Sequence, residues 1–284
     1  EHFNKVFASP IENKKDQEAG QRLKNVIKPF ILRRMKSDVL TELPPRTEIN
    51  INVELSKEET ALYEALRRQA VENLAQTEEA AAGQQRIKIL AEIMRLRRAC
   101  CHPKLVMPDS EISGAKLQAF AEIVTELKEN RHKALVFSQF VGHLAIIRDY
   151  LDSQNISYQY LDGSTPQKKR KVAIDAFQMG EGDLFLISLK AGGSGLNLTA
   201  ADYVIHMDPW WNPAVEDQAS DRAHRIGQKR PVTIYRLITQ NTIESKIVKL
   251  HQQKRELANN LLEGSEMSGK MSVSDMYNLL KESF

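Results

Sequence analysis

The sequence has few cysteines and no long apolar run. Its two cysteines among 284 residues, Cys100 and Cys101, are adjacent, which excludes a framework of several disulfide bonds and is typical of a reducing compartment. No apolar stretch reaches the roughly 18–20 residues that span a membrane, and the N-terminus lacks the layout of a secretory signal. We therefore expect an intracellular protein without a membrane partner. The lack of an initiator Met indicates a piece of a longer polypeptide.

The net charge of the chain is low, and common phosphate-binding motifs are absent from its sequence. The formal net charge is +3 at pH 7, so a surface that binds nucleic acid would have to be local. No G-x-x-x-x-G-K-[ST] phosphate loop occurs, and no predicted strand ends in an acidic pair suited to Mg²⁺. Structural zinc needs four ligands, which two neighbouring cysteines and scattered histidines do not supply. The chain by itself predicts neither a metal site nor a complete triphosphate site.

The pattern of predicted helices and strands changes near residue 114. Before it, helical periodicity predominates, with helices expected at 55–76 and at 84–102, the second stopping before Pro103. Ser56 and Glu59 have the spacing of a capping box at the start of the first helix. After it, helices alternate with short apolar strands, expected at 133–140, 156–164, 183–189, 201–208 and 232–238. This order predicts an α/β fold with a parallel, doubly wound sheet covered by helices. Ligands of such sheets bind at the carboxyl ends of the strands.

Residues 213–227 are expected to form one helix, capped at Asn212 and ended by Gly227. Four polar residues recur within and just after it at intervals of four, three and four, and so would share one face: Gln218, Arg222, Arg225 and Lys229. Guanidinium groups suit phosphate oxygens. The alternative is a solvated face on which Arg225 pairs with Asp221 one turn earlier.

Two loops on the same predicted edge have open interpretations. Glycines at 192, 193 and 195 follow a strand and would let backbone N–H groups approach a phosphate or ribose, or would simply form a tight turn. Trp210 and Trp211 would anchor a loop, or would stack on a base or wedge into a groove. The basic clusters at 95–98, 131–133 and 167–171 are interpreted as solvated faces, with phosphate tracking by the loop at 162–170 as an alternative.

In order along the chain, these segments resemble motifs of the SWI/SNF-type ATPases of helicase superfamily two. KALVFSQF, YLDGST, LISLKAGGSGLNLTAADYVIHMDPWWNP and EDQASDRAHRIGQKRPVTIYRLI are similar to helicase motifs IV, IVa, V and VI. VIKPFILRRMKSDVLTELPPRTE and LRRACCHPKLV resemble the segment between the two lobes of that family, and TIESKIVKLHQQKRELANNLLEG resembles its brace helix. The string DRAHRIGQ is the most specific of these, and the short spacings resemble the bacterial branch.

The resemblance implies a RecA-like C-terminal lobe and divides the chain into four segments. Residues 1–46 would be the inter-lobe segment from the end of the first lobe, and residues 47–113 a helical protrusion and linker. Residues 114–241 would be the RecA-like lobe, and residues 242–284 a brace helix and C-terminal tail. The first lobe, which would carry the phosphate loop and hold Mg²⁺, is outside this sequence.

The resemblance also implies residue roles. Two arginines would be arginine fingers that reach the ATP phosphates on the first lobe: Arg222 and Arg225. Five residues would line the nucleotide cleft, the glutamines orienting the fingers or contacting the nucleotide: Gly193, Gly195, Asn197, Gln218 and Gln228. Five would hold the DNA backbone while a tryptophan presses into the groove: Ser138, Gln139, Gly163, Ser164 and Lys190, with Trp211.

The implied function is that of the C-terminal motor lobe of an ATP-dependent translocase or remodeller on double-stranded DNA. ATP and Mg²⁺ would be bound mainly by the first lobe of the same polypeptide, so the isolated chain is expected to hydrolyse no ATP and to hold DNA weakly. Two alternatives stay open: a non-catalytic platform that binds DNA or protein, and a helicase that separates strands. The compartment would be the cytoplasm or nucleoid in a bacterium and the nucleus in a eukaryote.

Overall fold

The computed structural model describes residues 6–7, 10, 17–27, 43–75, 82–191, 196–250 and 279–281. The chain divides into two compact units: residues 1–42 with 249–271, and residues 43–248 with 272–284. The described helix of the first unit is α2 (Gln17–Ile27), on which Arg22 pairs with Glu18 one turn earlier at 3.2 Å. The candidate functional residues that the structure describes all belong to the second unit.

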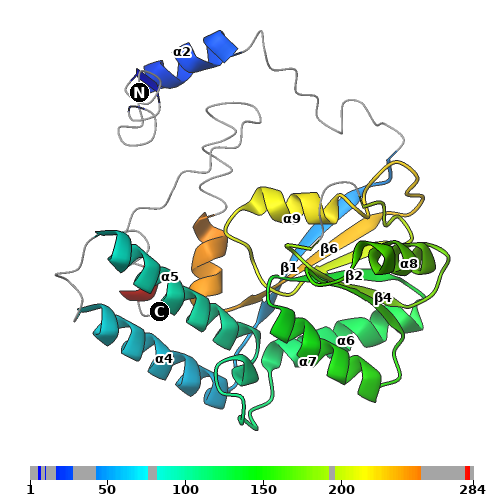
Figure 1. The fold of residues 1–284 in the computed structure, drawn as a ribbon, viewed down its shortest axis with the longest axis horizontal. Coiled ribbons are helices and arrows are strands. Elements are labelled where there is room, and N and C mark those ends of the chain that lie inside the picture. Colours follow the sequence, from blue (N-terminus) through cyan, green and yellow to red (C-terminus); the bar gives the residue numbers. More distant parts are fainter. Residues whose placement is uncertain are drawn as a thin grey trace. The chain divides into compact units, whose positions relative to one another are not determined.

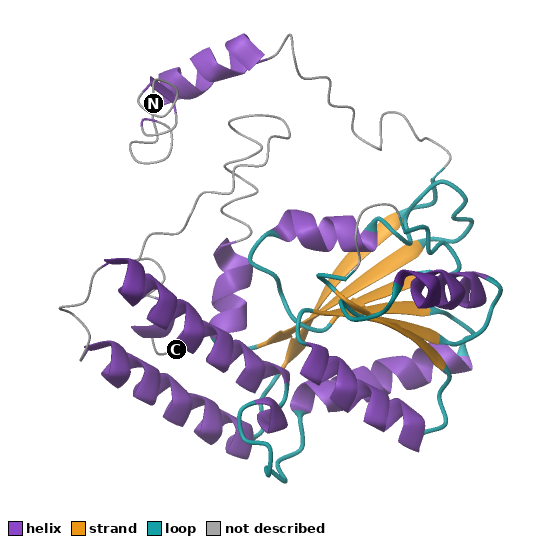
Figure 2. Cartoon of the chain, viewed as in Figure 1, coloured by secondary structure: helices purple, strands orange, loops and turns teal. Residues whose placement is uncertain are grey.

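The second unit is built around a parallel sheet of six strands in the order β1-β6-β5-β2-β4-β3 (Figures 1 and 2). Every neighbouring pair of strands is parallel. The prediction of a parallel α/β sheet is therefore confirmed. The strands are β1 (Arg46–Val53), β2 (Ala134–Ser138), β3 (Tyr158–Leu161), β4 (Leu184–Ser188), β5 (Tyr203–His206) and β6 (Val232–Thr239).

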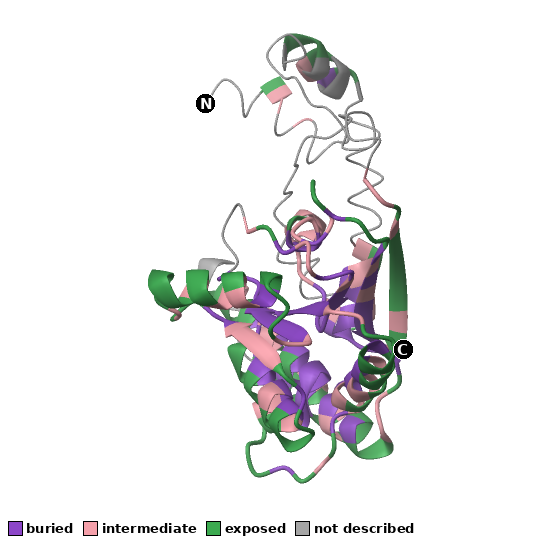
Figure 3. Ribbon diagram, turned by 90° about the vertical axis from the view of Figure 1, so that its right-hand side faces the viewer, coloured by how far each residue is buried: buried purple, intermediate pink, exposed green. Residues whose placement is uncertain are grey.

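Helices cover both faces of this sheet, because alternate strand residues enter two separate cores. On one face, Val136 and Leu186 pack with residues of α6 and α7; on the other, Phe137 and Ile187 pack with residues of α8 and α9. Burial on both faces explains why β2 and β4 are continuous apolar runs in the sequence. Figure 3 shows these buried strands between helices that are exposed on their outer sides. The four helices are α6 (Ala115–Glu129), α7 (Val141–Ser153), α8 (Gln167–Gln178) and α9 (Pro213–Ser220).

Two long helices, α4 (Lys57–Ala75) and α5 (Ala82–Cys101), pack against each other, and α5 contacts α6. The start of α4 has the predicted capping box: Glu59 N–H donates to Ser56 Oγ at 3.1 Å, and Ser56 N–H donates to the Glu59 carboxylate at 2.9 Å. The other oxygen of that carboxylate accepts the N–H of Ala115 at 3.0 Å. One side chain thus joins the helix pair to the layer of helices on the sheet.

β1 was not expected from the sequence, which predicted a helical segment at residues 47–113. β1 lies at one edge of the sheet and pairs with β6 from Arg46↔Val232 to Val53↔Thr239. Its apolar residues alternate with Asn and Glu at a period of two, but Asn and Glu are poor strand formers, so the propensity of the segment for a strand is low. Most of β1 is exposed, as the green strand of Figure 3 shows. The division of the chain after residues 46, 113 and 241 stays a prediction, with most of β1 inside the second segment.

The predicted closing helix at 242–264 lies only in part within the described residues. Residues 243–250 are helical, and the rest of that prediction falls outside the described part. In the tail, residues 279–281 are helical, and Lys246 Nζ donates to the carbonyl of Leu279 at 2.9 Å. Among the helices that the structure describes, none combines the length and apolar character needed to cross a membrane.

Candidate functional site

The loops that follow the parallel strands lie at one edge of the sheet. β2 ends at Ser138 and β4 at Ser188, and backbone hydrogen bonds hold the strand ends side by side. Leu189 N–H donates to the Ser138 carbonyl at 3.0 Å, and Met207 N–H donates to the Phe137 carbonyl at 2.9 Å. Because ligands of parallel α/β sheets bind at this edge, its loops form the candidate site.

The helix predicted at 213–227 is shorter than expected. α9 begins as predicted, with Asn212 Oδ1 accepting the N–H of Ala214 at 3.1 Å, but it ends at Ser220. Ser220 Oγ and His206 Nε2 are 2.9 Å apart in the core, and short turns follow. Backbone hydrogen bonds there span three residues, from Arg222 N–H to the Ala219 carbonyl at 3.3 Å and from Ala223 N–H to the Ser220 carbonyl at 3.1 Å. The prediction of a shared helical face is therefore wrong for Arg222, Arg225 and Lys229.

Arg222 lies in the turns after α9, with its guanidinium against the core. Its Cζ is 5.3 Å from the ring centroid of Phe137 on β2. Arg222 Nη1 is buried and has no hydrogen-bond partner within the described part of the chain. Burial lowers the pKa of Arg222 to about 10, so the group is still protonated at neutral pH. A buried charge is costly without an opposite charge. Among the described residues, the buried Nη1 of Arg222 therefore has no acceptor.

Three more residues predicted for the nucleotide cleft are exposed: Arg225, Gln218 and Asn197. Leu198 N–H donates to the carbonyl of Arg222 at 3.0 Å, which brings the end of the glycine-rich loop to the turn that holds Arg222. Asp221 was the alternative partner predicted for Arg225. In the structure Asp221 Oδ1 forms an ion pair with Arg46 Nη1 at 3.3 Å. Gly193 and Gly195 lie outside the described residues.

Gln228 is buried, and its amide group bonds only backbone groups in the described structure. Its Nε2 donates to three carbonyls and its Oε1 accepts two N–H groups, with distances of 2.8–3.2 Å: Thr199, Ala201 and Ala223, and Lys229 and Arg230. The side chain therefore joins the segment after the glycine-rich loop to the turns that carry the two arginines. This arrangement favours an orienting role for Gln228 over contact with a nucleotide.

Three of the predicted DNA contacts are exposed on neighbouring loops: Gly163, Ser164 and Lys190. Ser164 N–H and Oγ donate to Asp162 Oδ1 at 2.9 and 2.7 Å, which shapes the turn after β3. Arg170 of α8 donates to the carbonyls of Asp162 at 3.0 Å and Ala191 at 2.8 Å. Arg170 thereby ties this turn to the segment after β4, so the three predicted contacts lie on one exposed rim.

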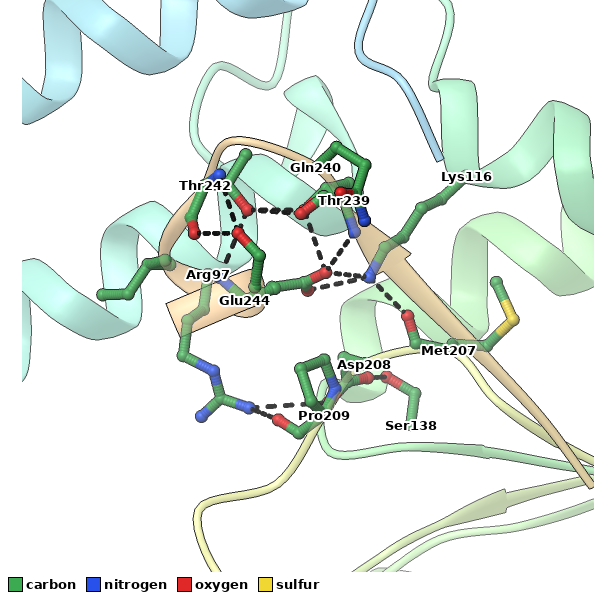
Figure 4. A network of polar contacts seen from close by, with 12 residues as sticks. Arg97, Lys116, Ser138, Met207, Asp208, Pro209, Thr239, Gln240, Thr242 and Glu244 are labelled. Carbon is green, nitrogen blue, oxygen red and sulfur yellow. Dashed lines mark hydrogen bonds and ion pairs between the residues drawn. The ribbon is translucent and has the colours of Figure 1, made fainter. Parts of the chain in front are cut away.

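The other three predicted DNA contacts lie around Asp208: Ser138, Gln139 and Trp211. Ser138 is fully buried, and its hydroxyl donates to Asp208 Oδ2 at 2.5 Å (Figure 4). Gln139 N–H donates to the same oxygen at 3.3 Å, and both Gln139 and Trp211 are half-buried. Burial raises the pKa of Asp208, while Arg97 and Ser138 act in the opposite direction. Ser138 thus has an internal partner, whereas Gln139 and Trp211 reach the surface.

The sequence analysis missed two arginines of this edge. Arg97, interpreted as part of a solvated face, is fully buried, and that interpretation is wrong. Its signal was the buried residues four positions before and after it on α5, Ile93 and Cys101, which share its helical face. Arg170 is half-buried and bonds backbone carbonyls of two loops.

A second buried cation, Lys116 of α6, extends this network below the strand ends (Figure 4). Its Nζ donates to Glu244 Oε1 and to the carbonyl of Met207, both at 2.7 Å, and both charged side chains are fully buried. Thr239 donates its N–H and hydroxyl to Glu244 Oε2 at 3.0 and 2.9 Å. The pair joins α6 to the ends of β5 and β6.

Within the described ranges, three buried side chains place potential metal-ligand atoms within 4.8 Å of one another: Cys101, His143 and Asp208. Both carboxylate oxygens of Asp208 already accept hydrogen bonds from Ser138 or Gln139. The guanidinium of Arg97 is 3.8 Å from Asp208 Oδ1. Because the oxygens are occupied and a cation lies beside them, this group does not fit a metal ion.

Two family models match the chain in succession. Residues 1–105 match the SNF2-related domain, and residues 115–227 match the helicase conserved C-terminal domain. The second match extends from the start of α6 through the turns that hold the two arginines.

Similar proteins cover nearly the whole chain. It is 41% identical over 259 residues to an uncharacterized ATP-dependent helicase of Mycoplasma pneumoniae. The aligned region covers 91% of this chain and 25% of the relative. The chain thus spans about a quarter of that relative. The solved Sulfolobus solfataricus SWI2/SNF2 ATPase core in complex with dsDNA is 33% identical with a TM-score of 0.69, over 99% of this chain and 60% of that one. The C-terminal domain of the Sulfolobus protein is 28% identical with a TM-score of 0.68, over 84% of this chain and 100% of that one.

Proposed function

The chain belongs to the SWI/SNF-type ATPase family and has the RecA-like fold of its C-terminal lobe, and we propose that it is the C-terminal motor lobe of an ATP-dependent translocase on double-stranded DNA. In this proposal a first lobe of the same polypeptide binds ATP and Mg²⁺. The present lobe supplies cationic donors to the ATP phosphates and holds the backbone of the DNA. Closure of the two lobes around ATP and their reopening after hydrolysis would alternate the grip on DNA.

The observation that carries the proposal is the incomplete environment of Arg222. Its guanidinium is protonated and packed on Phe137, and Nη1 has no partner among the described residues. A merely solvated side chain would not have its Nη1 buried without an acceptor. A phosphate from outside the lobe would supply the missing anion, and it would gain from donors that are already fixed in place. Arg225, three residues later and exposed, is the second donor of this proposal.

Magnesium is assigned to the first lobe. Two acidic residues of this edge, Asp162 and Asp208, accept hydrogen bonds from their own or neighbouring loops, so neither offers an open carboxylate pair. In phosphoryl transfer Mg²⁺ neutralises charge that develops on the phosphates. The residues of this chain would act from the opposite side of the phosphates, through Arg222 and Arg225.

DNA binding is proposed for the exposed rim of Gly163, Ser164 and Lys190. Lys190 provides an exposed cation for phosphate oxygens, and the exposed turn after β3 lies on the same rim. The N–H and hydroxyl of Ser164 donate to Asp162, so they would exchange that acceptor for a phosphate oxygen. Contacts of this type hold a DNA backbone without reading its sequence. The similar Sulfolobus core was solved with dsDNA, which supports a duplex as the ligand.

The test is ATP hydrolysis by a polypeptide that carries both lobes, measured with and without duplex DNA, beside this 284-residue chain alone. We expect duplex DNA to stimulate the two-lobe protein, the chain alone to show no turnover, and a forked duplex to stay paired. DNA-stimulated turnover by the chain alone, or a two-lobe protein that ignores DNA, would contradict the proposal. Unwinding of the fork would replace it with a strand-separating helicase.

A further inference from the structure

We propose that Arg97 is a positioning residue through which α5 fixes two DNA-facing loops, the one at Gln139 after β2 and the one at Trp211 after β5. The proposal rests on the DNA-binding role proposed above for this edge. It assigns a task to a residue outside the predicted site, on a helix that supplies none of the predicted contacts.

Hydrogen bonds from Arg97 reach both loops. Its Nη1 donates to Gln139 Oε1 at 3.1 Å, and its Nη2 donates to the carbonyl of Pro209. The same Nη2 is 3.8 Å from Asp208 Oδ1, and Asp208 in turn accepts the hydroxyl of Ser138 (Figure 4). A planar guanidinium fork is suited to this task because its donors diverge at fixed angles, which an ammonium group does not provide.

Aromatic rings of the same two loops surround the guanidinium. Its Cζ is 5.7 Å from the ring centroid of Phe140, 5.9 Å from that of Trp210 and 5.4 Å from that of Trp211. Attraction between a cation and the face of a ring strengthens when both are desolvated. Arg97 therefore contacts the ring of Trp211 directly and also holds the backbone two residues before it.

Packing alone does not account for an arginine at this position. Its side chain is fully buried, and a buried charge destabilises the fold unless pairing and hydrogen bonds offset its lost hydration. The neighbouring turn of α5 fills the core with Ile93, and an apolar residue at 97 would do the same. An apolar side chain would leave the Pro209 carbonyl and the Gln139 amide without their donor. The arginine thus adds a fixed geometry to the two loops.

The chain contains its own reporter of this geometry, because its only two tryptophans are Trp210 and Trp211. The test variant is Arg97→Lys, which keeps the charge and removes the fork. The matched control is Lys88→Met, which removes a charge from an exposed position of the same helix. Tryptophan emission and its quenching by acrylamide measure how far the loop after β5 is exposed to solvent. The fluorescence anisotropy of a labelled duplex measures DNA affinity.

We expect Arg97→Lys to unfold cooperatively, to increase acrylamide quenching, and to raise the Kd for duplex DNA by about 3- to 30-fold. Lys88→Met should leave quenching unchanged. In a double-mutant cycle, the effect of Arg97→Lys on the Kd should largely disappear when Trp211→Phe is already present, since both changes disturb one loop.

Unchanged quenching in a folded Arg97→Lys protein, or additive effects with Trp211→Phe, would overturn the proposal. If Arg97→Lys does not fold, Gln139→Ala removes one acceptor of the fork without touching α5, and the proposal then requires increased quenching in that variant. A wild-type chain that binds no duplex would count against the proposed function, while the quenching experiment would still decide the role of Arg97.

Discussion

Arg222 and Phe137 meet at the carboxyl edge of the sheet, where the guanidinium carbon lies 5.3 Å from the centroid of the ring. The Arg222 guanidinium is partly shielded from water there, and this burial lowers its pKa to about 10. The described residues include no hydrogen-bond partner for its Nη1. A half-buried guanidinium with a buried Nη1 that lacks an acceptor does not add to the stability of the fold.

This arrangement predicts the effect of removing the guanidinium. Arg222→Met should leave the free energy of unfolding unchanged or raise it by about 1 kcal/mol, because a half-buried guanidinium without an ion pair in the described structure is replaced by an apolar side chain. The comparison variant is Arg236→Met, since Arg236 is buried and pairs with Glu216 at 2.9 Å and Glu48 at 2.7 Å. That variant should lose about 3 kcal/mol. Urea unfolding compares the two, and an equal loss in both would contradict this interpretation of Arg222.

The two glutamines predicted for the cleft should differ in their effect on stability. Gln228→Ala removes a buried amide that bonds backbone groups of several segments, and it should lower the free energy of unfolding by about 1–3 kcal/mol. Gln218→Ala changes an exposed residue of α9 and should stay within about 0.5 kcal/mol of wild type. Urea unfolding of both variants tests this difference. A neutral Gln228→Ala variant would remove the orienting role.

The exposed rim predicts a dependence of DNA binding on salt. Lys190→Ala should weaken binding to duplexes of any sequence to a similar extent and reduce the slope of log K against log salt by about 1. Lys128→Ala is the matched control, because Lys128 is an exposed cation in the last turn of α6 and precedes β2 instead of following a strand. Titrations by fluorescence anisotropy at several salt concentrations measure both slopes. Equal slopes for wild type and Lys190→Ala would exclude a phosphate contact at this residue.

The turn after β3 should contribute stability that disappears in acid. Burial raises the pKa of Asp162, but hydrogen bonds from Ser164, Tyr160 and Thr165 outweigh it and lower the pKa to about 2. Because the pKa is lower in the folded protein than its usual 3.8, the contribution is complete above pH 4 and is lost as the pH falls toward 2. The difference in unfolding free energy between wild type and Asp162→Asn should therefore be constant from pH 7 to about 5 and shrink below 4. A difference that stays constant down to pH 3 would contradict this.

The sheet itself was predictable, because five of its strands are short apolar runs bounded by turn residues. The capping box at Ser56 and the N-cap at Asn212 were predictable as well, since each depends on residues a few positions apart. Two features depend instead on distant contacts. β1 is a strand because it pairs with β6, although its Asn and Glu residues have a low propensity for strands. α9 ends at Ser220, where the serine hydroxyl meets His206 in the core.

The positions of the arginine side chains also depend on contacts that are distant in the sequence. Spacing on an assumed helix placed Arg222 and Arg225 on one face, and the early end of α9 removes that argument. Arg222 is half-buried, and its Nη1 has no hydrogen-bond partner among the described residues. Arg97 was treated as part of a basic cluster, although its position on the buried face of α5 was visible from Ile93 and Cys101. Sequence periodicity can indicate that such a residue is buried. It cannot indicate which loops the side chain joins.

The most direct test of the central claim is the rate of ATP hydrolysis by a two-lobe polypeptide with duplex DNA present, measured for wild type, Arg222→Ala, Arg225→Ala and the control Lys229→Ala. If the arginines act on the ATP phosphates, each arginine variant should lose about 10³-fold or more in turnover. Lys229 is exposed in the same loop and its removal should change the rate little. Arginine variants that hydrolyse ATP at the wild-type rate would contradict the account and favour a platform that binds DNA or protein without catalysis.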